Sequence, residues 1–164
     1  MRLTPGFLWT NWVSTYQKTK FMVYSTNFIG KRFSDIALNI GGETIDRVTK
    51  LKYLGVVFDE NLSWEEHIKQ VHSKASSRLY LYRQIRNFLD TKQSKIVFTS
   101  LVQSVMDYAD TIWSSCSFKS QNALQKIRSR GLRCIHNIPN FRAKSHHIAD
   151  LLHQTGWTGL ATRR

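Results

Sequence analysis

Carboxylate pairs are the first place to look for catalytic chemistry in this chain, and Asp107 and Asp110 stand three residues apart. On a helix this spacing puts both carboxylates on one face, where they could hold one cation. Two-metal catalysis, however, needs convergent ligands around ions about 4 Å apart in a dry cleft. We therefore interpret both aspartates as solvated helix carboxylates and predict neither catalytic nor metal-binding residues.

Histidines and cysteines could form a different site, a zinc centre near the C-terminal end. His136 stands two residues after Cys134, and His146, His147 and His153 follow. Structural zinc sites use paired Cys and His spacings that this cluster does not have. We interpret these histidines as surface or nucleic-acid-facing residues. Cys134 is expected to be an inert thiol, because it falls on the apolar arc of its helix.

Four cations on one predicted helix give the clearest binding signal. At about 100° per residue, they fall within about 60° of one another on a single face: Lys119, Lys126, Arg130 and Arg133. No acidic residue lies between Lys119 and Arg142 to neutralise them. Such a row suits the phosphate backbone of a nucleic acid, and four phosphate contacts on a duplex would give a log–log salt slope of about −3.6. The alternative is an ordinary solvated helix face, where Lys and Arg are common.

The charge balance of the chain also indicates a polyanionic partner. The formal net charge is +13 over 164 residues. Residues 1–62 carry 8 Lys and Arg against 5 Asp and Glu, whereas residues 63–164 carry 16 against 6. This asymmetry favours nucleic acid over anionic lipid as the partner. A basic surface that is merely solvated is the alternative.

Neither a membrane segment nor a disulfide framework is predicted. No apolar run approaches the ~18 residues of a membrane span, and Pro5, Gly6 and Asn11 interrupt any signal-peptide core. Cys116 and Cys134 lie in different segments without a paired spacing, which favours a reducing compartment. We therefore expect a nuclear or cytoplasmic protein with no membrane partner.

Short strands are predicted for the first third of the chain. Residues 21–25 are a strand candidate, and residues 36–40 and 43–48 are expected to form a hairpin around two glycines. Residues 53–58, an apolar run with one glycine, predict a strand covered on both faces that completes a small antiparallel sheet. This region is expected to have an exposed edge and to be the less stable part.

A first helix is predicted to begin at Trp64, where Ser63 and Glu66 have the spacing of a capping box. Its apolar residues recur at three and four positions and form one stripe: Ile68, Val71, Ala75, Leu79, Tyr82 and Leu89. Its cations flank this stripe, and Arg86 lies within it. We interpret them as snorkelling charges around a core helix rather than as a binding face.

Two further helices complete the predicted bundle. Asp90 or Thr91 is expected to cap the second, whose apolar positions are Phe98, Leu101, Val102, Val105, Met106, Ala109, Ile112 and Trp113. Ser117 or Ser120 is expected to cap the third, and Pro139 to end it. The apolar arc of the third helix consists of Ala123, Leu124, Ile127, Gly131, Cys134, Ile135 and Ile138.

Several motifs follow one another in a recognisable order between residues 9 and 157. Lys18-Thr19-Lys20 precedes an apolar strand, and residues 50–68 read KLKYLGVVFDENLSWEEHI. Residues 101–113 and 124–135 follow, and then Thr155-Gly156-Trp157. In this order the segments resemble parts of the reverse transcriptases of non-LTR retrotransposons, most closely those of the jockey-like group. The parts are the KT motif, the segment after the palm, and the thumb helices with the segment that follows them.

The resemblance implies roles for particular residues. Lys18 and Thr19, with Lys20 as an alternative position for the lysine, match the KT motif, whose lysine lies near the departing pyrophosphate in such polymerases. Tyr53, Leu54 and Gly55 match the primer-grip hairpin, where a glycine lets the backbone approach the primer strand. Without the resemblance, Tyr53 and Leu54 would be ordinary core strand residues.

The resemblance also implies what the chain lacks. Polymerases of this family bind catalytic metal ions with palm aspartates, one set lying in a Tyr-x-Asp-Asp box before the KT motif. Too little sequence precedes Lys18 to hold that box. Residues 108–111 read Tyr-Ala-Asp-Thr and imitate it, but they fall in a helical pattern, so we interpret them as a decoy. We expect the fragment to be inactive alone and to hold no cofactor, while the full enzyme would need Mg²⁺.

The expected fold class is α+β, with a small antiparallel β region followed by a three-helix, thumb-like bundle. Residues 1–62 would form the palm edge with its primer-grip-like strand, residues 63–141 the bundle, and residues 142–164 a poorly determined tail. Three functions compete: a fragment of a reverse transcriptase that grips template–primer beside the missing palm and fingers, a stand-alone nucleic-acid-binding or protein-interaction module derived from a transposable element, and a non-functional remnant.

Overall fold

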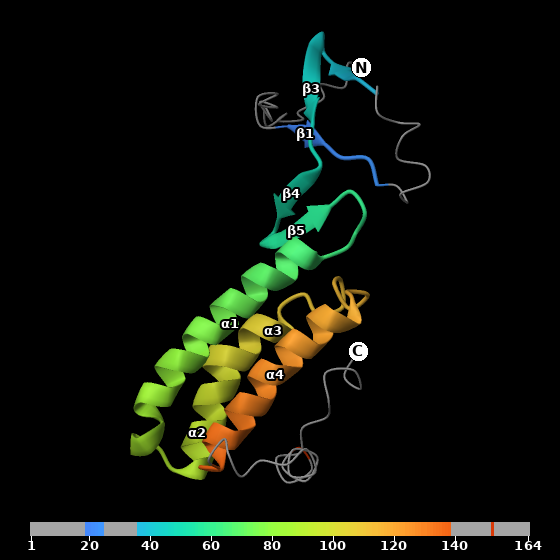
Figure 1. The fold of residues 1–164 in the computed structure, drawn as a ribbon. Helices are drawn as coiled ribbons and strands as arrows, with labels where there is room; N and C mark the ends of the chain where they lie inside the picture. Colours follow the sequence, from blue (N-terminus) through green and yellow to red (C-terminus); the bar gives the residue numbers. More distant parts are fainter. Residues whose placement is uncertain (1–18, 25–35, 139–151, 153–164) are drawn as a thin grey trace, which may run out of the picture.

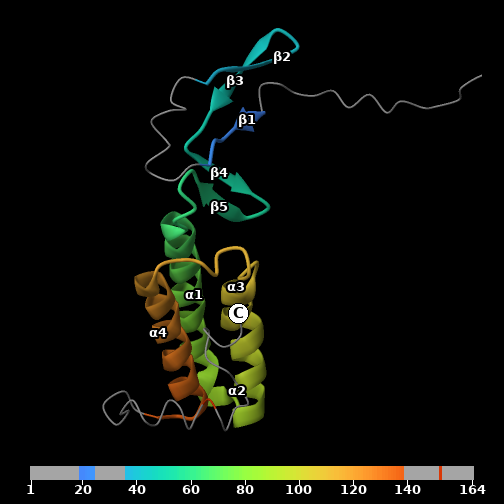
Figure 2. The same ribbon diagram turned by 90° about the vertical axis from the view of Figure 1, so that its right-hand side faces the viewer.

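The computed structural model describes residues 19–24, 36–138 and 152. Within these ranges, two small sheets lie at one end of the molecule and a bundle of helices lies at the other (Figure 1). A long first helix leads away from the strands, and the following helices pack beside it (Figure 2). The α+β fold class predicted from the sequence is confirmed.

The first sheet has three strands in the order β1-β3-β2. Strands β2 (Leu38–Ile40) and β3 (Glu43–Arg47) pair antiparallel, as predicted. Gly41 and Gly42 connect them with φ values of 62° and 88°. Because positive φ is strained for residues that carry a Cβ, the two glycines allow this tight hairpin.

The strand predicted for residues 21–25 is wrong in length and direction. β1 (Lys20–Phe21) has two residues and pairs parallel with β3. Phe21 pairs with Arg47, the last residue of β3, and the chain then leaves the sheet toward the next strand. A longer β1 therefore has no partner on β3. Residue 25 lies outside the described residues.

Residues 53–58 form a hairpin rather than the single buried strand that was predicted. β4 (Lys50–Tyr53) and β5 (Val56–Asp59) pair antiparallel in a separate sheet of two strands. Leu54 and Gly55 connect them with φ values of 45° and 82°, and two consecutive positive φ values produce the tight loop that matches strand twist. The prediction failed because an apolar leucine occupies the turn.

The first helix begins one residue later than predicted, and Asp59 replaces the predicted capping box. α1 (Glu65–Ile85) follows Trp64, whose φ is 62°. The Asp59 carboxylate accepts hydrogen bonds from the amides of Ser63 and Trp64, at 2.9 and 3.0 Å. It also accepts from the Asn61 amide at 3.2 Å and the Ser63 hydroxyl at 3.0 Å. Burial favours a higher pKa for Asp59, but these bonds hold the pKa below its ordinary value.

The apolar stripe of α1 forms one wall of the core. Five of its six predicted members are buried, and Leu89 is half-buried after the short turn η3 (Arg86–Phe88). The hydroxyl of Tyr82 is hydrogen-bonded to that of Ser94 on the next helix, so its polar end is satisfied inside the core.

The second helix is capped by Asp90, as predicted, and Gln93 completes a capping box with it. The chain continues through α2 (Thr91–Phe98), the π-helical turn η4 (Thr99–Gln103) and α3 (Ser104–Asp107). The prediction that this helix extends to Ile112 is wrong, because the backbone becomes left-handed at Ala109, where φ is 53°.

Trp113 anchors the chain that follows α3. Its side chain is fully buried, and its indole N–H donates to the Tyr108 carbonyl at 3.1 Å. The buried indole therefore fixes this turn against the core. Ile112, which was predicted to be apolar core, is instead 47% exposed.

The third helix of the bundle is α4 (Phe118–Ile135), and the side chain of Ser117 accepts from the Ser120 amide at its start. Gly131 permits close packing on α2, since a Cβ there would lie 2.0 Å from the Phe98 ring. The predicted arc is buried at Leu124, Ile127, Gly131 and Ile135, and half-buried at Ala123, Cys134 and Ile138. Arg128, which was not predicted in the core, is 1% exposed. Pro139 lies outside the described residues.

None of the described helices combines the length and apolar character needed to cross a membrane. Cys116 and Cys134 both carry free thiols, the first buried and the second half-buried.

Candidate nucleic-acid interface

The cationic row predicted on the third helix lies along the outside of α4. Lys119, Lys126 and Arg130 are exposed, whereas Arg133 is half-buried. In the described part of the chain, no ion pair joins these four side chains to an acidic residue. At 1.5 Å per residue, the exposed cations Lys119 and Arg130 lie about 16.5 Å apart along the helix axis. The exposed part of the row is therefore long enough to follow several phosphates of one strand.

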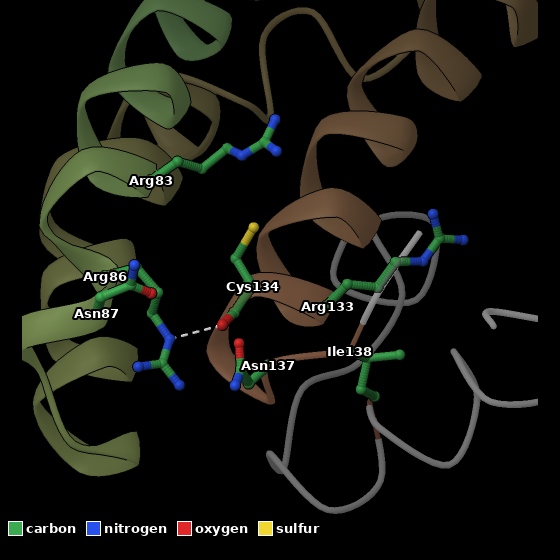
Figure 3. A pocket seen from close by; sticks show the side chains of 7 residues that line it. All are labelled: Arg83, Arg86, Asn87, Arg133, Cys134, Asn137 and Ile138. Carbon is green, nitrogen blue, oxygen red and sulfur yellow. Dashed lines mark hydrogen bonds between the residues drawn. The ribbon is translucent and has the colours of Figure 1, made fainter. Parts of the chain in front are cut away.

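Arg86 does not act as a snorkelling charge, and that interpretation is wrong for this residue. Its Nε donates to the Cys134 carbonyl at 2.6 Å and its Nη2 to the Ile135 carbonyl at 2.8 Å (Figure 3). Its Nη1 donates to the Leu89 carbonyl at 2.8 Å. The last carbonyls of a helix lack partners within the helix and carry partial negative charge. Arg86 therefore caps α4 and ties it to the end of α1.

A hollow of about 270 Å³ lies between α1 and α4, and residues of both helices line it: Ser76, Leu79, Tyr80, Arg83, Arg130 and Cys134. Tyr80 is 63% exposed, so its ring is accessible from solvent. Arg83 adds a cation from α1 opposite Arg130 of α4. The interpretation of the α1 cations from their own helix alone missed this pairing. The sequence did contain a sign of a shared polar face on this helix, because four residues recur at helical spacing: Ser76, Tyr80, Arg83 and Asn87.

The predicted primer-grip residues form the exposed tip of the β4–β5 hairpin. Tyr53 and Leu54 are 62% and 74% exposed, so the alternative interpretation as core strand residues is wrong. The Tyr108 hydroxyl donates to the Leu54 carbonyl at 2.6 Å. A Cβ on Gly55 would lie 3.6 Å from Cε1 of Tyr108, an ordinary contact, so its φ of +82° rather than crowding favours glycine. Tyr108, the first residue of the decoy box, thus holds this turn from the bundle.

A hollow of about 250 Å³ opens between this turn and the helices α1 and α3, with Lys74 and Arg78 in its wall. Arg78 donates from Nη1 to the Leu101 carbonyl at 3.1 Å. His67 lies in the same wall and accepts from the Val57 amide through Nδ1 at 3.3 Å. Burial and the nearby Lys74 lower the pKa of His67. His67 is therefore neutral at pH 7, and the charge of this hollow comes from Lys74 and Arg78.

The KT-like residues are described only in part. Thr19 is exposed and directly precedes β1. Lys18 lies outside the described residues.

Among the described residues, no group of three His, Cys, Asp or Glu side chains is placed to hold a metal ion. Asp107 accepts a hydrogen bond from Nε2 of Gln103 at 2.7 Å. α3 ends at Asp107, so Asp110 does not share a helix face with it, and the expectation of one face is wrong.

The thiol and imidazole at the end of α4 are both uncharged at neutral pH. Burial raises the pKa of Cys134, although Arg83 and Arg86 act in the opposite direction. Burial and Arg86 lower the pKa of His136. The other histidines considered for zinc, at 146, 147 and 153, lie outside the described residues.

Comparisons with known proteins connect the chain to mobile-element polymerases. No protein-family model matches, and no solved structure matches. The chain is 23% identical over 107 residues to a probable RNA-directed DNA polymerase from transposon BS of Drosophila melanogaster. The match covers 63% of this chain and 12% of that protein. This distant similarity supports a reverse transcriptase at the level of the family.

Proposed function

We propose that the chain is a piece of the reverse transcriptase of a non-LTR, jockey-like retrotransposon and that it grips the template–primer duplex. The distant similarity to a transposon RNA-directed DNA polymerase supports this origin. One observation carries the gripping role: Lys119, Lys126 and Arg130 are exposed in a row without acidic partners in the described residues. Such a row suits the evenly spaced charges of a phosphate backbone.

The β4–β5 turn would supply the second contact, as a primer grip. Leu54 is 74% exposed and Gly55 carries no side chain, so a primer strand could approach this turn closely. Lys18 and Thr19 would stand near the departing pyrophosphate in the complete polymerase.

Catalysis would require the palm and fingers of the complete enzyme. As the resemblance to this family implies, its Mg²⁺ ions would be held by palm carboxylates outside this chain. We therefore propose that the chain is inactive alone and acts in the nucleus or cytoplasm. Leu38 and Ile40 of β2 are 43% and 49% exposed, which supports docking of the β region against the palm.

A binding titration across salt concentrations tests the gripping role. The full chain would be titrated with an RNA–DNA template–primer, together with a variant in which Lys119, Lys126 and Arg130 are all changed to glutamate. Three lost phosphate contacts would reduce the magnitude of the log–log salt slope by about 2.7 and weaken binding at least tenfold at low salt.

A matched triple variant separates this effect from the loss of overall charge. Lys50, Lys69 and Lys92 are exposed and lie outside both the α4 row and the β4–β5 turn, so changing them to glutamate removes the same charge elsewhere. Equal weakening by both triple variants would refute the α4 interface. Primer extension in Mg²⁺ by the isolated chain would refute the proposal that it is inactive alone.

A further inference from the structure

A second hollow lies where α1 and α4 both end (Figure 3). Its volume is about 230 Å³, and its wall consists of Arg83, Arg86, Asn87, Arg133, Cys134, Asn137 and Ile138. Three of these seven residues are arginines, and none of them is acidic. This density of positive charge distinguishes it from the exposed row, whose cations follow one another along the helix surface.

The charge of this hollow is not neutralised by its own wall. Cys134 contributes no thiolate, because burial raises the pKa of its thiol despite the two arginines beside it. No ion pair joins Arg83, Arg86 or Arg133 to an acidic residue in the described part of the chain. An anion from solution would therefore be attracted into the space.

The donors are partly fixed in place before any ligand binds. Arg86 is held by three carbonyls, which leaves two of its five N–H bonds for a ligand. Figure 3 shows Arg83 reaching toward α4 on the side of the Cys134 thiol, while Arg133 extends on the far side of that residue. Arg133 therefore adds positive charge beside the hollow, whereas Arg83, Arg86 and Asn87 supply the donors that face it.

We propose that this hollow binds a phosphate monoester dianion. Guanidinium and amide N–H groups match the three terminal oxygens of a phosphate, and two negative charges would suit an uncompensated group of arginines. A terminal phosphate can enter a hollow more easily than a phosphate within a continuous nucleic-acid backbone. Free inorganic phosphate and the 5′-phosphate of a nucleic-acid strand share this chemistry, and the second source rests on the proposed function.

The first experiment uses inorganic phosphate with the full chain at constant ionic strength, followed through the arginine Nε–H signals in NMR spectra. Arg83→Met removes one exposed cation of the wall. Lys69→Met removes the same charge on the same helix, about 21 Å away. We expect saturable binding that Arg83→Met weakens about tenfold or more and Lys69→Met changes less than about twofold. Circular dichroism would establish that both variants are folded.

Asn87→Ala provides a second test of the wall without changing charge, and we expect it to weaken phosphate binding about threefold to tenfold. Absence of saturable binding would overturn the proposal. Equal weakening by Arg83→Met and Lys69→Met would also overturn it, because that result would indicate only a general charge effect.

The second experiment distinguishes the two sources of the phosphate. Two template–primer duplexes of the same sequence would carry a 5′-phosphate or a 5′-hydroxyl. A preference of about fivefold or more for the phosphorylated duplex, lost in Arg83→Met, would assign the hollow to a strand end. Equal affinity for both duplexes would rule out the strand end. Binding of inorganic phosphate without any duplex binding would refute the proposed gripping function and leave the anion site standing.

Discussion

The helices and the first sheet of this protein differ in how well their apolar surfaces are covered. The core of the bundle contains several fully buried side chains: Tyr82, Phe98, Val102, Met106, Trp113, Leu124, Ile127 and Ile135. In the described part of the first sheet, Ile45 alone is buried, and Leu38 and Ile40 are more than two-fifths exposed. The bundle can therefore carry its own stability, whereas this sheet needs another surface against which to pack.

The β4–β5 hairpin stands between these two extremes. Val56 and Val57 are 2% and 7% exposed, and Val56 belongs to the same core as the helices. Asp59 and Tyr108 connect this hairpin to the bundle by hydrogen bonds. Burial of apolar side chains therefore decreases with distance from the helical core, and we expect local stability to decrease in the same direction.

The largest expected effect is the loss of Trp113. Trp113→Ala should reduce the free energy of unfolding of the bundle by about 3–5 kcal/mol, because it removes a fully buried indole. Ile112→Ala, one residue away and 47% exposed, should cost less than about 1 kcal/mol. Denaturant titration followed by helical circular dichroism would measure both. Similar losses would show that the chain reversal is not organised around Trp113.

Overpacking between α2 and α4 should have the next largest effect. Gly131→Ala places a Cβ 2.0 Å from the Phe98 ring and should cost about 1–3 kcal/mol. In a Phe98→Leu background, Gly131→Ala should reduce the free energy of unfolding by less than it does beside phenylalanine. In Gly42→Ala the new Cβ would meet no atom within 4 Å, but the φ of +88° would strain the alanine. This substitution should therefore affect the hairpin and leave the stability of the bundle unchanged. Additive losses in the double variant would argue against the clash.

Replacement of Asp59 tests the junction between sheet and bundle. Asp59→Asn should destabilise the hairpin and the first turn of α1 by about 1–2 kcal/mol, since charged hydrogen bonds are lost. The folded-state pKa of Asp59 lies below its ordinary value of 3.8. The unfolded chain therefore binds more protons in acid, and this stability is complete above about pH 5 and lost as pH falls through the folded pKa. The free energies of unfolding of wild type and variant, measured at several pH values, should converge in acid. A difference that stays constant with pH would contradict the role of the charge.

Removal of the Tyr108 hydroxyl should have the smallest effect and the most local one. Tyr108→Phe deletes the hydrogen bond to the Leu54 carbonyl, which is worth about 1 kcal/mol. Hydrogen exchange at the amides of Gly55 and Val56 should become about fivefold faster, while exchange in α4 stays unchanged. Uniform acceleration in both regions would mean that the hairpin and the bundle open as one unit.

Most of the fold could be predicted from local patterns. The stripe of α1, the Asp90 cap and the glycine hairpin follow from residues near one another in sequence, and all three are observed. The errors occurred where local chemistry gave no warning. Leu54 occupies a turn although it is apolar, and helical spacing continued to Ile112 although the helix had ended.

The candidate site could be predicted only where it lies on one helix. The row on α4 follows from spacing alone, and three of its four cations are exposed. Arg83 and Tyr80 could not be assigned to the hollow between α1 and α4, because this required the facing helix. The half-buried position of Arg133 also depends on neighbours outside α4.

The sequence by itself determined the succession of a β region and a helical region, most of the apolar faces and the row of cations, because each arises from the periodicity of a single element. The tertiary structure decided the tasks of individual side chains. Arg86 caps a carbonyl 48 residues away, and Tyr108 holds a turn 54 residues away. Hydrogen bonds of this kind depend on ångström distances between distant segments, which packing of the whole core establishes and no local pattern encodes.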